Sequence, residues 1–454
     1  MSQLNIVILA AGKGKRMLSA RPKVLHEIMD KPMLEYVVEE ARKLSPSKIV
    51  VVTGHEKGLV EERLRSAGVL FAVQEEQKGT AHALLTAEGM IGDGDSTGDV
   101  LVLYGDVPLV SAETLRAFLA FFETSEGVAF MTTEVNNPDG YGRVIMEGNE
   151  IREIVEDADA DQAQKKIREI NTGICMLRRD TLSLAKEIKA ENAKGEYYLT
   201  DICKVAGTRG IRVKGYHYGD AQEVLGINTR KELLEANRIM RERILDRHLQ
   251  QGVTLLGEAI YIEQDVQIGR DTVIFPFSYL RGTTTIGEGA TIGPHVVIKD
   301  SQLGDTVTVE PFCSLDGVTA EPNVKIGPFS RIRPTTILKE GVKIGNFVEV
   351  KNSVIMENSK ANHLSYLGDA EIGKEVNIGA GTITCNYDGK KKHRTTIEDG
   401  VFVGSNTELV APVRIGKDAT IGAGSTITRD VPDGALAVTR VEQKHIEGYA
   451  RRKK

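Results

Sequence analysis

The sequence predicts an α/β layered domain, then one long helix, and then a parallel β-helix. Strand-like apolar runs alternate with helical segments up to about residue 228, as in layered α/β domains. After about residue 252, an apolar residue instead recurs every six positions, which is the repeat of a β-helix. We therefore expect a domain over residues 1–228, a linker helix over residues 229–251 and a β-helix domain over residues 252–454.

The composition is that of a globular protein, and it argues against binding to nucleic acid or crossing a membrane. The 454 residues are 41% hydrophobic and 27% charged, with a formal net charge of -6. No apolar run approaches the roughly 20 residues that span a bilayer, and the short N-terminal apolar stretch lacks the features of a leader. The four cysteines are far apart and lack metal-binding spacing, so we expect free thiols in the reducing cytoplasm.

Three buried strands and one helix are predicted early in the first half. The runs at residues 6–9, 49–52 and 100–103 are rich in valine, isoleucine and leucine, as in strands buried on both faces of a parallel sheet. Residues 33–43 have helical spacing. Open α/β sheets bind ligands at the carboxyl ends of their strands, so we expect the site of this domain there.

The linker helix has both of its ends marked in the sequence. Thr229 and Glu232 form a capping-box pattern at its start, and Gly252 suits its end. Four apolar residues can share one face of the helix: Leu233, Met240, Ile244 and Leu245.

The six-residue repeat fills most of the second half. Its apolar members are Ile268, Ile274, Leu280, Ile286, Ile292, Ile298, Leu303, Val309, Leu315, Ile326, Ile332, Leu338, Ile344, Val350, Ile372, Ile378, Ile397, Val403, Leu409, Ile415, Ile421 and Ile427. Neither an α-helix nor a β-hairpin protein repeats in sixes, whereas one short strand and one corner of a β-helix occupy six residues. We expect the apolar residues to point into the stack and the glycines that follow many of them to form corners.

Two stretches interrupt the repeat, at residues 356–367 and at residues 386–394. Insertions in solenoids become loops, often on the binding face. We expect two loops that serve a site, although tolerated surface loops are the alternative.

A glycine-rich segment from Leu9 to Met17 follows the first predicted strand. Its glycines would let backbone N–H groups approach a phosphate. A dinucleotide-binding fold is the alternative, but its fingerprint requires a small residue where Met17 stands. The cations Lys13, Lys15 and Arg16, with Lys23 shortly after, favour a nucleoside triphosphate.

Two further segments of the first half carry groups suited to a nucleotide and its metal. Asp106 follows the run at residues 100–103, where its carboxylate could bind Mg2+, although an aspartate that caps a turn before Pro108 is the alternative. Residues 74–81 supply amide and hydroxyl groups that could bind a base.

His363 lies in the first interruption and is a candidate general base. Imidazole has a pKa suited to proton transfer, although a lone loop histidine is often incidental. Cations that could bind an anion and polar groups that could form hydrogen bonds occur in the same region: Arg333, Lys351, Lys360, Asn377, Asn386 and Tyr387.

Taken together, these motifs resemble those of the sugar nucleotidyltransferases. The matching segments are L-A-A-G-x-G-x-R-M from Leu9, P-K at Lys23, Q-x-x-x-x-G-T from Gln74 and Y-G-D at Tyr104, followed by segments at residues 140–143, 155–156, 169–173 and 226–228. With the hexapeptide half and the K-A-N-H-L-S-Y-L-G-D segment around His363, nearly the whole chain resembles the family of bifunctional N-acetylglucosamine-1-phosphate uridylyltransferase/glucosamine-1-phosphate N-acetyltransferases. Lys15 and Asn362 depart from its pattern, which often has threonine and glycine there.

This resemblance implies a Rossmann-like first domain that transfers a uridylyl group from UTP to N-acetylglucosamine 1-phosphate with Mg2+. It implies that Arg16 and Lys23 face phosphates and that Asp106 and Asn228 bind the metal. The implied nucleotide- and sugar-binding residues are Leu9, Ala10, Ala11, Gly12, Gln74, Gly79, Thr80, Tyr104, Gly105, Gly142, Glu156 and Asn171.

For the second domain, the resemblance implies a left-handed β-helix that transfers acetyl from acetyl-CoA to glucosamine 1-phosphate, with His363 as the general base. The implied sugar-phosphate ligands are Arg333, Lys351, Tyr366 and Asn377. The implied acetyl-CoA ligands are Ala380, Asn386, Tyr387, Ser405, Ala423 and Arg440. The resemblance also implies a homotrimer. We further expect Glu349 to orient His363 and residues 390–394 to help bind coenzyme A phosphates, although a solvated loop is the alternative for this segment.

Two other functions remain open at this point. The chain could be a single-function nucleotidyltransferase, such as a mannose-1-phosphate guanylyltransferase, with a structural solenoid. It could also be a non-catalytic scaffold built from the same two folds. The presence of Lys23, Asp106 and Asn228 argues against a scaffold, and His363, Tyr366 and the segment at residues 386–394 argue against a purely structural solenoid.

Overall fold

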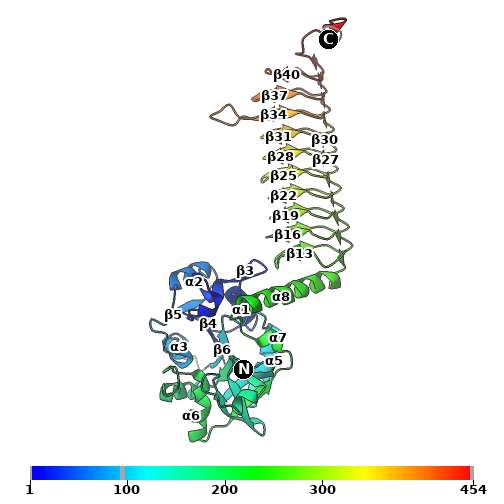
Figure 1. The fold of residues 1–454 in the computed structure, drawn as a ribbon. Helices are drawn as coiled ribbons and strands as arrows, with labels where there is room; N and C mark the ends of the chain where they lie inside the picture. Colours follow the sequence, from blue (N-terminus) through cyan, green and yellow to red (C-terminus); the bar gives the residue numbers. More distant parts are fainter. Residues whose placement is uncertain (1–2, 93–97, 450–454) are drawn as a thin grey trace. The chain divides into compact units, whose positions relative to one another are not determined.

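The computed structural model describes residues 3–92 and 98–449 (Figure 1). The chain forms two compact units, which divide between Met240 and Arg241.

Among the described residues, the first unit is built on a nine-stranded mixed sheet with the order β5-β4-β1-β6-β10-β7-β11-β9-β8. Its strands are β1 (Leu4–Leu9), β4 (Lys48–Thr53), β5 (Leu70–Val73), β6 (Asp99–Tyr104), β7 (Val128–Glu134), β8 (Arg143–Glu147), β9 (Glu150–Val155), β10 (Glu169–Leu177) and β11 (Val213–His217). The neighbours β5, β4, β1 and β6 are parallel, and β10 is antiparallel to β6 and β7. The three predicted strands are therefore adjacent and parallel, and the remainder of the sheet is mixed.

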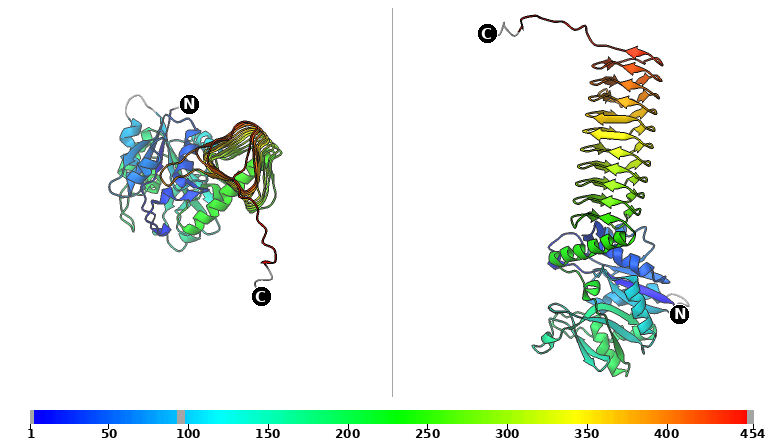
Figure 2. Two further views of the ribbon diagram at one scale, coloured as in Figure 1. Left: turned by 90° about the horizontal axis from the view of Figure 1, so that it is seen from above. Right: turned by 90° about the vertical axis from the view of Figure 1, so that its right-hand side faces the viewer.

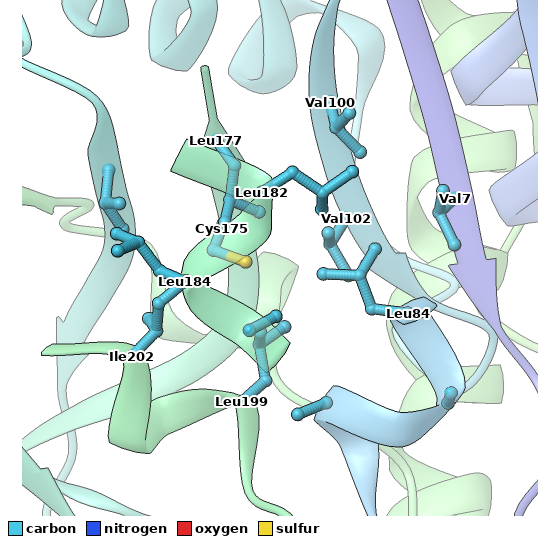
Figure 3. Packing of buried hydrophobic residues seen from close by; sticks show 14 of the residues in the cluster. Val7, Leu84, Val100, Val102, Cys175, Leu177, Leu182, Leu184, Leu199 and Ile202 are labelled. Carbon is cyan, nitrogen blue, oxygen red and sulfur yellow. The ribbon is translucent and has the colours of Figure 1, made fainter. Parts of the chain in front are cut away.

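The sheet buries both of its faces, because helices cover each of them. On one face, α1 (Met33–Arg42) and α5 (Ala112–Phe122) share a core with Ile6 and Ile8 of β1. On the other face, α3 (Thr80–Thr86) and α6 (Ile202–Thr208) share a core with Val7 and Leu9. Figure 3 shows the second core, in which side chains from both helices meet those of the sheet. The alternation along β1 explains why its sequence is a continuous apolar run.

Shorter elements complete the first unit. They are β2 (Glu27–Ile28), β3 (Lys31–Pro32), α2 (Lys57–Arg63), α4 (Glu88–Gly92), α7 (Ala221–Val224) and the 3-10 helices η1 (Lys15–Met17), η2 (Lys23–Leu25), η3 (Gln164–Lys166), η4 (Asp180–Glu187) and η5 (Leu199–Asp201).

The predicted long helix is α8 (Arg230–Gln250). Its capping box is present, since the Glu232 carboxylate accepts from the Thr229 N–H at 3.0 Å and the Thr229 hydroxyl accepts from the Glu232 N–H at 3.2 Å. At the other end, Gly252 has a φ of 86° and the Val253 N–H donates to the His248 carbonyl.

The second unit is a β-helix whose three sheets contain only parallel pairings among the described residues. The first sheet comprises β12 (Thr254–Leu255), β15 (Val273–Ile274), β18 (Thr291–Ile292), β21 (Thr308–Val309), β24 (Lys325–Ile326), β27 (Lys343–Asn346), β30 (Lys360–His363), β33 (Asn377–Ile378), β36 (Phe402–Val403), β39 (Thr420–Ile421) and β41 (Leu436–Ala437). The second comprises β13 (Tyr261–Ile262), β16 (Tyr279–Arg281), β19 (Val297–Lys299), β22 (Ser314–Asp316), β25 (Arg331–Ile332), β28 (Glu349–Lys351), β31 (Tyr366–Gly368), β34 (Ile383–Cys385), β37 (Glu408–Val410) and β40 (Thr426–Ile427). The third comprises β14 (Gln267–Ile268), β17 (Thr285–Ile286), β20 (Gln302–Leu303), β23 (Val318–Ala320), β26 (Thr336–Leu338), β29 (Val354–Ile355), β32 (Ala370–Ile372), β35 (Thr395–Ile397) and β38 (Val413–Ile415).

The six-residue repeat forms the core of this unit, as predicted. Every apolar member of the series is less than 9% exposed. Equivalent residues pair from coil to coil, as in Ile268 with Ile286 and Ile274 with Ile292. Figure 2 shows the coils stacked one upon another.

Only one of the two predicted loops exists. Residues 386–394 leave the stack after β34 (Figure 1). The stretch at residues 356–367 instead continues the coils through β30 and β31, with Ala361 paired to Ile344 and Ile378. Ala361 is 1% exposed and takes the inward position. The six-residue repeat is therefore disturbed here by a small core residue and a shortened coil.

Two bulk predictions can be compared with the structure. All four cysteines are free thiols. Within residues 3–92 and 98–449, none of the helices has the length and apolar character needed to traverse a bilayer.

Candidate functional sites

A cavity of about 830 Å3 opens in the first unit, and most of its walls are residues singled out from the sequence. Predicted residues among the lining are Leu9, Ala10, Ala11, Gly12, Arg16, Lys23, Gln74, Gly79, Thr80, Tyr104, Asp106 and Asn228. β1 and β6, which are parallel neighbours, end at Leu9 and Tyr104. The cavity therefore lies at the carboxyl ends of these two strands, as expected for an open α/β sheet.

The glycine-rich segment is held against Lys23. Gly14 has a φ of 59°, and a Cβ there would lie 2.5 Å from the Cβ of Lys23. A side chain at this position would push the segment away from Lys23, so the glycine permits the close approach. Gly12, by contrast, has open space around its Cα.

Oxygen and nitrogen ligands from three segments converge at the cavity wall. The Lys23 ammonium contacts the Asp106 carboxylate and donates to the Asn228 amide oxygen at 2.6 Å. Arg16 donates to the same amide oxygen at 2.8 Å. The backbone N–H of Asn228 donates to the Glu232 carboxylate of the α8 capping box at 2.5 Å, and this bond positions Asn228.

This arrangement fits Mg2+. Asp106 and Asn228 both approach the same ammonium nitrogen with hard oxygen atoms, so their oxygens can share a cation. Mg2+ is typically held by one or two protein oxygens together with substrate phosphates. No cluster of three or more His, Cys, Asp or Glu ligands occurs among the described residues, so a third ligand group would have to come from substrate or water.

The segment after β5 is fixed by its backbone. Gly79 has a φ of 113°, and a Cβ there would lie 2.4 Å from the Tyr197 carbonyl oxygen. The Gln74 amide nitrogen donates to the Gly79 carbonyl at 3.0 Å, and the Thr80 hydroxyl accepts from the Leu199 N–H at 2.8 Å. These bonds orient Gln74 and Thr80, both of which line the cavity.

Gly142, Glu156 and Asn171 lie together next to Tyr104. A Cβ on Gly142 would be 3.5 Å from the Glu156 carboxylate and 3.7 Å from the Asn171 Cβ, and the Asn171 N–H donates to the Gly142 carbonyl. The Thr200 hydroxyl donates to Glu156 at 2.9 Å. Burial raises the pKa of Glu156, which favours its neutral form.

Some residues of this site were missed, and one predicted residue has a packing role. Lys194 and Glu196 line the cavity, but their segment carries no local motif that would single them out, whereas Gln77 belongs to the predicted segment at residues 74–81. The Gly105 N–H donates to the Leu9 carbonyl, and a Cβ there would lie 3.0 Å from Leu34. Gly105 thus brings the ends of β1 and β6 together without lining the cavity.

In the second unit, His363 is oriented by Asn346. The Asn346 amide oxygen lies 2.6 Å from the imidazole Nδ1, and the two residues are paired between β27 and β30. An oxygen acceptor at Nδ1 selects the tautomer with the proton there, which leaves the Nε2 lone pair available. We had expected Glu349 to orient His363, but Glu349 accepts from Arg333 at 3.0 Å.

Three cations gather on the second sheet. Arg333 follows β25 and Lys351 ends the neighbouring strand β28, and the loop brings Lys392 to Lys351. The nearby Lys392 ammonium, with a smaller contribution from Arg333, lowers the pKa of Lys351. Such a cluster of like charges favours an anion between them. Lys392 lies in the segment expected to bind coenzyme A, yet its neighbours are the predicted sugar-phosphate ligands.

A polar network supports the same face. The Asn386 amide nitrogen donates to the Asp369 carboxylate at 2.5 Å and to the Tyr366 hydroxyl at 3.5 Å. Asn352 donates to the other Asp369 oxygen at 2.5 Å. Asn386 and Asp369 are each 8% exposed, so the base of the loop is anchored in the coil.

The tip of the loop is exposed but ordered by Asp388. Its carboxylate accepts from the backbone N–H groups of Lys390 and Lys391 and pairs with His393 at 2.7 Å. These contacts, above all the Lys391 N–H, lower the pKa of Asp388 to about 2. Tyr387 is 61% exposed.

The predicted acetyl-CoA ligands follow one corner of the β-helix. Pairing in the first sheet aligns Ala361 with Ile378, Ile378 with Val403, and Val403 with Ile421. The residues two positions after these aligned strand residues lie at one corner of successive coils. They are four predicted site residues: His363, Ala380, Ser405 and Ala423. Arg440 donates to the Ala423 carbonyl at 2.8 Å. Asn377 lies on the adjoining outer face, paired with Lys360 and Phe402.

Lys15 and Asn362 are the two departures from the family pattern, and the one whose side chain the structure describes does not disturb the geometry of the site. Asn362 has a strand conformation in β30, so the backbone does not require glycine there. The side chain of Lys15 lies outside the described part of the structure.

Three protein families match parts of the chain. Residues 5–221 match the family described as nucleotidyl transferase. Residues 265–300 and 394–429 match the bacterial transferase hexapeptide family (six repeats). Residues 314–392 match the GMPPB C-terminal domain.

Relatives match the chain from end to end. The bifunctional protein GlmU of Ralstonia nicotianae is 46% identical over 452 residues, which cover 99% of this chain and 98% of that protein. The bifunctional protein GlmU of Thermotoga petrophila is 48% identical over 453 residues, which cover 99% of both. A solved structure of UDP-glucose pyrophosphorylase complexed with UDP-glucose is 22% identical, with a TM-score of 0.43, and covers 54% of this chain and 100% of that chain.

These relatives decide between the functions left open by the sequence. Both are named as bifunctional proteins and match this chain along nearly their whole length, which argues against a single-function enzyme and a scaffold. The sheets of parallel strands and the hexapeptide match are those of a left-handed β-helix, as expected. The chain therefore belongs to the family of bifunctional GlmU proteins, with a nucleotidyltransferase half and a hexapeptide acyltransferase half.

Proposed function

We propose that this member of the family, an enzyme of UDP-N-acetylglucosamine synthesis, divides its two reactions as follows. Residues 252–454 transfer acetyl from acetyl-CoA to glucosamine 1-phosphate. Residues 1–228 then transfer a uridylyl group from UTP to N-acetylglucosamine 1-phosphate, and residues 229–251 link the two domains.

In the acetyl transfer, His363 acts as the general base. Its Nε2 takes a proton from the sugar ammonium, and the freed amine attacks the thioester carbonyl carbon. The C–S bond breaks as the nitrogen loses a second proton. One of the two protons goes to the leaving thiolate of coenzyme A, and the other goes to solvent. The bond from Asn346 to Nδ1 keeps Nε2 available as an acceptor.

The substrates of this reaction are held by the groups around His363. Arg333 and Lys351 neutralise the phosphate of glucosamine 1-phosphate, and Lys392 lies close enough to Lys351 to join them. Tyr366 and Asn377 bind the sugar. Acetyl-CoA lies along the corner that carries Ala380, Ser405, Ala423 and Arg440, with Asn386 and Tyr387 beside the thioester.

In the uridylyl transfer, a phosphate oxygen of the sugar 1-phosphate attacks the α-phosphorus of UTP. The bond from the α-phosphorus to the bridging oxygen breaks, and pyrophosphate leaves. Arg16 and Lys23 offset the charge of the phosphates, so the protein needs no nucleophile of its own. In this structure Lys23 contacts Asp106. When UTP binds, the Lys23 ammonium turns toward the phosphates.

The remaining groups of the cavity bind the two substrates. Leu9, Ala10, Ala11, Gly12, Gln74, Gly79, Thr80, Tyr104 and Gly105 hold or shape the place of the uridine nucleotide. Gly142, Glu156 and Asn171 contact the N-acetylglucosamine moiety. Asp106 and Asn228 hold Mg2+, which when bound neutralises phosphate charge and orients the α-phosphate.

We also propose that the enzyme is a cytoplasmic homotrimer. The supporting observations are the four free thiols and the long β-helix, whose open faces suit cyclic assembly.

The observation that carries the proposal is that each unit has its own set of reactive groups. Lys23, Asp106 and Asn228 converge in the first, and the second carries the pairs His363–Asn346 and Lys351–Lys392. The test is to incubate the protein with glucosamine 1-phosphate, acetyl-CoA, UTP and Mg2+. Free thiol and pyrophosphate should both appear, and pyrophosphate should depend on acetyl-CoA. Thiol without pyrophosphate would contradict the role of the first unit.

A further inference from the structure

One guanidinium links the two short helices that carry the cations of the nucleotide cavity. Arg16 lies in η1, which ends at Met17. Lys23 begins η2, which His26 closes, because the His26 N–H donates to the Lys23 carbonyl at 3.2 Å. The Arg230 side chain reaches both of these helix ends. Its Nε donates to the Met17 carbonyl at 3.2 Å, and its Nη1 donates to Nδ1 of His26 at 3.2 Å.

Arg230 belongs to the segment that supplies a third group of the same cavity wall. It is the first residue of α8 and lies two residues after Asn228. The capping box fixes this start of the helix, since Glu232 accepts from the backbone N–H groups of Asn228 and Thr229 at 2.5 and 3.0 Å. Arg230 therefore ties both cation-bearing helices to a fixed point of the fold.

The local surroundings of Arg230 and His26 do not explain why these residues are present. A cation in the first turn of a helix is unfavourable, because the free N–H groups there carry partial positive charge. His26 is 5% exposed, and its Nε2 has no hydrogen-bond partner among the described residues. Such a buried nitrogen costs free energy that an apolar residue would avoid. Residues that break local rules in this way are expected near functional sites.

The contact requires a neutral imidazole at His26. Because Arg230 donates to Nδ1, this nitrogen is the acceptor and the proton lies on Nε2. Burial, followed by the positive charges of Arg230 and Arg21, lowers the pKa of His26, and Glu27 opposes this shift weakly. The imidazole therefore remains an acceptor at neutral pH.

Arg16 and Lys23 need a restraint of this kind. Both donate to the Asn228 amide oxygen, at 2.8 and 2.6 Å, so their two positive charges lie close together and repel. Charges that stabilise a transition state must be held in place before the reaction. A displacement of about 1 Å can lower a rate about 100-fold.

We propose that Arg230 and His26 form a clasp that positions Arg16 and Lys23 for uridylyl transfer. The inference rests on the proposed function of the first unit. The clasp holds the ends of the two short helices, so the side chains of the two cations stay free to turn toward the phosphates of UTP. Arg230 and His26 are positioning residues in this role, because they act through Arg16 and Lys23.

Variants of the full-length protein separate the clasp from the fold. Arg230→Met removes both bonds, whereas Arg230→Lys keeps the charge without the fork that reaches two acceptors. His26→Leu removes the acceptor, whereas His26→Asn keeps a side-chain oxygen near the place of Nδ1. The matched control is Arg21→Gln, since Arg21 is an exposed cation of the same segment and pairs with Glu27, outside the clasp.

The measurement is kcat and the KM for UTP, with added N-acetylglucosamine 1-phosphate, while acetyl transfer and circular dichroism verify folding. Arg230→Met and His26→Leu should each lower kcat about 10- to 100-fold and leave acetyl transfer unchanged. His26→Asn should recover most of kcat, Arg230→Lys should be intermediate, and Arg21→Gln should match wild type. Arg230→Met combined with His26→Leu should lose no more than the weaker single variant, because both break the same contact.

Wild-type kcat in folded Arg230→Met would overturn the clasp, and so would losses that multiply in the double variant. If Arg230→Met does not fold, the pair at position 26 decides, because equal losses in His26→Asn and His26→Leu would contradict a role for the acceptor. A wild type without uridylyl transfer would overturn the proposed function and the clasp with it. An active wild type whose kcat Arg230→Met leaves intact would overturn the clasp alone.

Discussion

At the scale of single residues, the acetyl site depends on how its polar groups hold one another. Asn346 fixes the imidazole of His363, and the bond is possible because the two residues are exact strand partners in adjacent coils. An amide oxygen at Nδ1 selects the tautomer without adding charge, so the Nε2 lone pair points away from Asn346 and can accept a proton. A carboxylate at Nδ1 would instead place a negative charge beside the imidazole.

Asn346→Asp should therefore raise the pKa of His363, because the added negative charge stabilises the imidazolium form. We expect the acid limb of the pH profile of acetyl kcat/KM to move up by about one unit. The measurement is thiol release from pH 5 to 9, with uridylyl transfer as the folding control. An unchanged profile would show that Asn346 does not govern the base.

Lys392 is expected to bind the sugar phosphate together with Lys351. Lys392→Gln should raise the KM for glucosamine 1-phosphate about 10-fold, because a charge-assisted hydrogen bond is lost, and should change kcat little. Lys390→Gln, an exposed lysine in the same loop, is the matched control. If the KM for acetyl-CoA rose instead, the original assignment of this segment to coenzyme A would be right.

The limits of sequence reasoning at this scale have a physical cause. His363, Lys23 and Asp106 could be singled out because their chemistry is rare and their local motifs are distinctive. Asn346 lies 17 residues from His363 and in no motif, and only the coil register brings the two together. Lys194 reaches the nucleotide cavity in a similar way, through a loop whose path depends on the tertiary fold.

At the scale of elements, the stability of the second unit depends on a histidine at the end of α8. His248 is 1% exposed, and burial lowers its pKa to about 4. Its ordinary pKa is 6.5, so between pH 6.5 and pH 4 the unfolded chain binds a proton that the folded chain does not. The free energy of unfolding therefore falls as the pH falls through this range, by at most about 3 kcal/mol.

His248→Gln should reduce this pH dependence, because glutamine does not titrate. The measurement is urea unfolding at pH 7.5 and pH 5.0, followed by circular dichroism. We expect the wild type to lose more stability than the variant between the two pH values. Equal losses would mean that His248 is already protonated in the folded protein at pH 5.

Elements with regular patterns were predictable, and irregular ones were not. The capping box of α8 and the inward residues of the β-helix follow from local spacing, and the structure confirms both. The stretch at residues 356–367 was expected to be a loop, because the six-residue step fails there. A coil shortened by one residue gives the same disturbed pattern as an insertion, and only the paired strands distinguish the two.

At the scale of the whole molecule, the chain combines two units with unrelated architectures and separate reactive groups. The first gathers cations beside a cavity at the carboxyl ends of parallel strands. The second uses one corner of a repeating solenoid, where chemistry varies from coil to coil while the core stays constant. The strand–helix alternation of the first half and the six-residue repeat of the second half predicted this division.

The central claim is that each unit performs one reaction with its own residues. The most direct measurement is to assay both reactions in Asp106→Ala and His363→Ala, with circular dichroism to verify folding. We expect His363→Ala to lose acetyl transfer by a factor of at least about 100 and to keep uridylyl transfer from added N-acetylglucosamine 1-phosphate, and Asp106→Ala to do the reverse. Loss of both activities in either folded variant would contradict the claim.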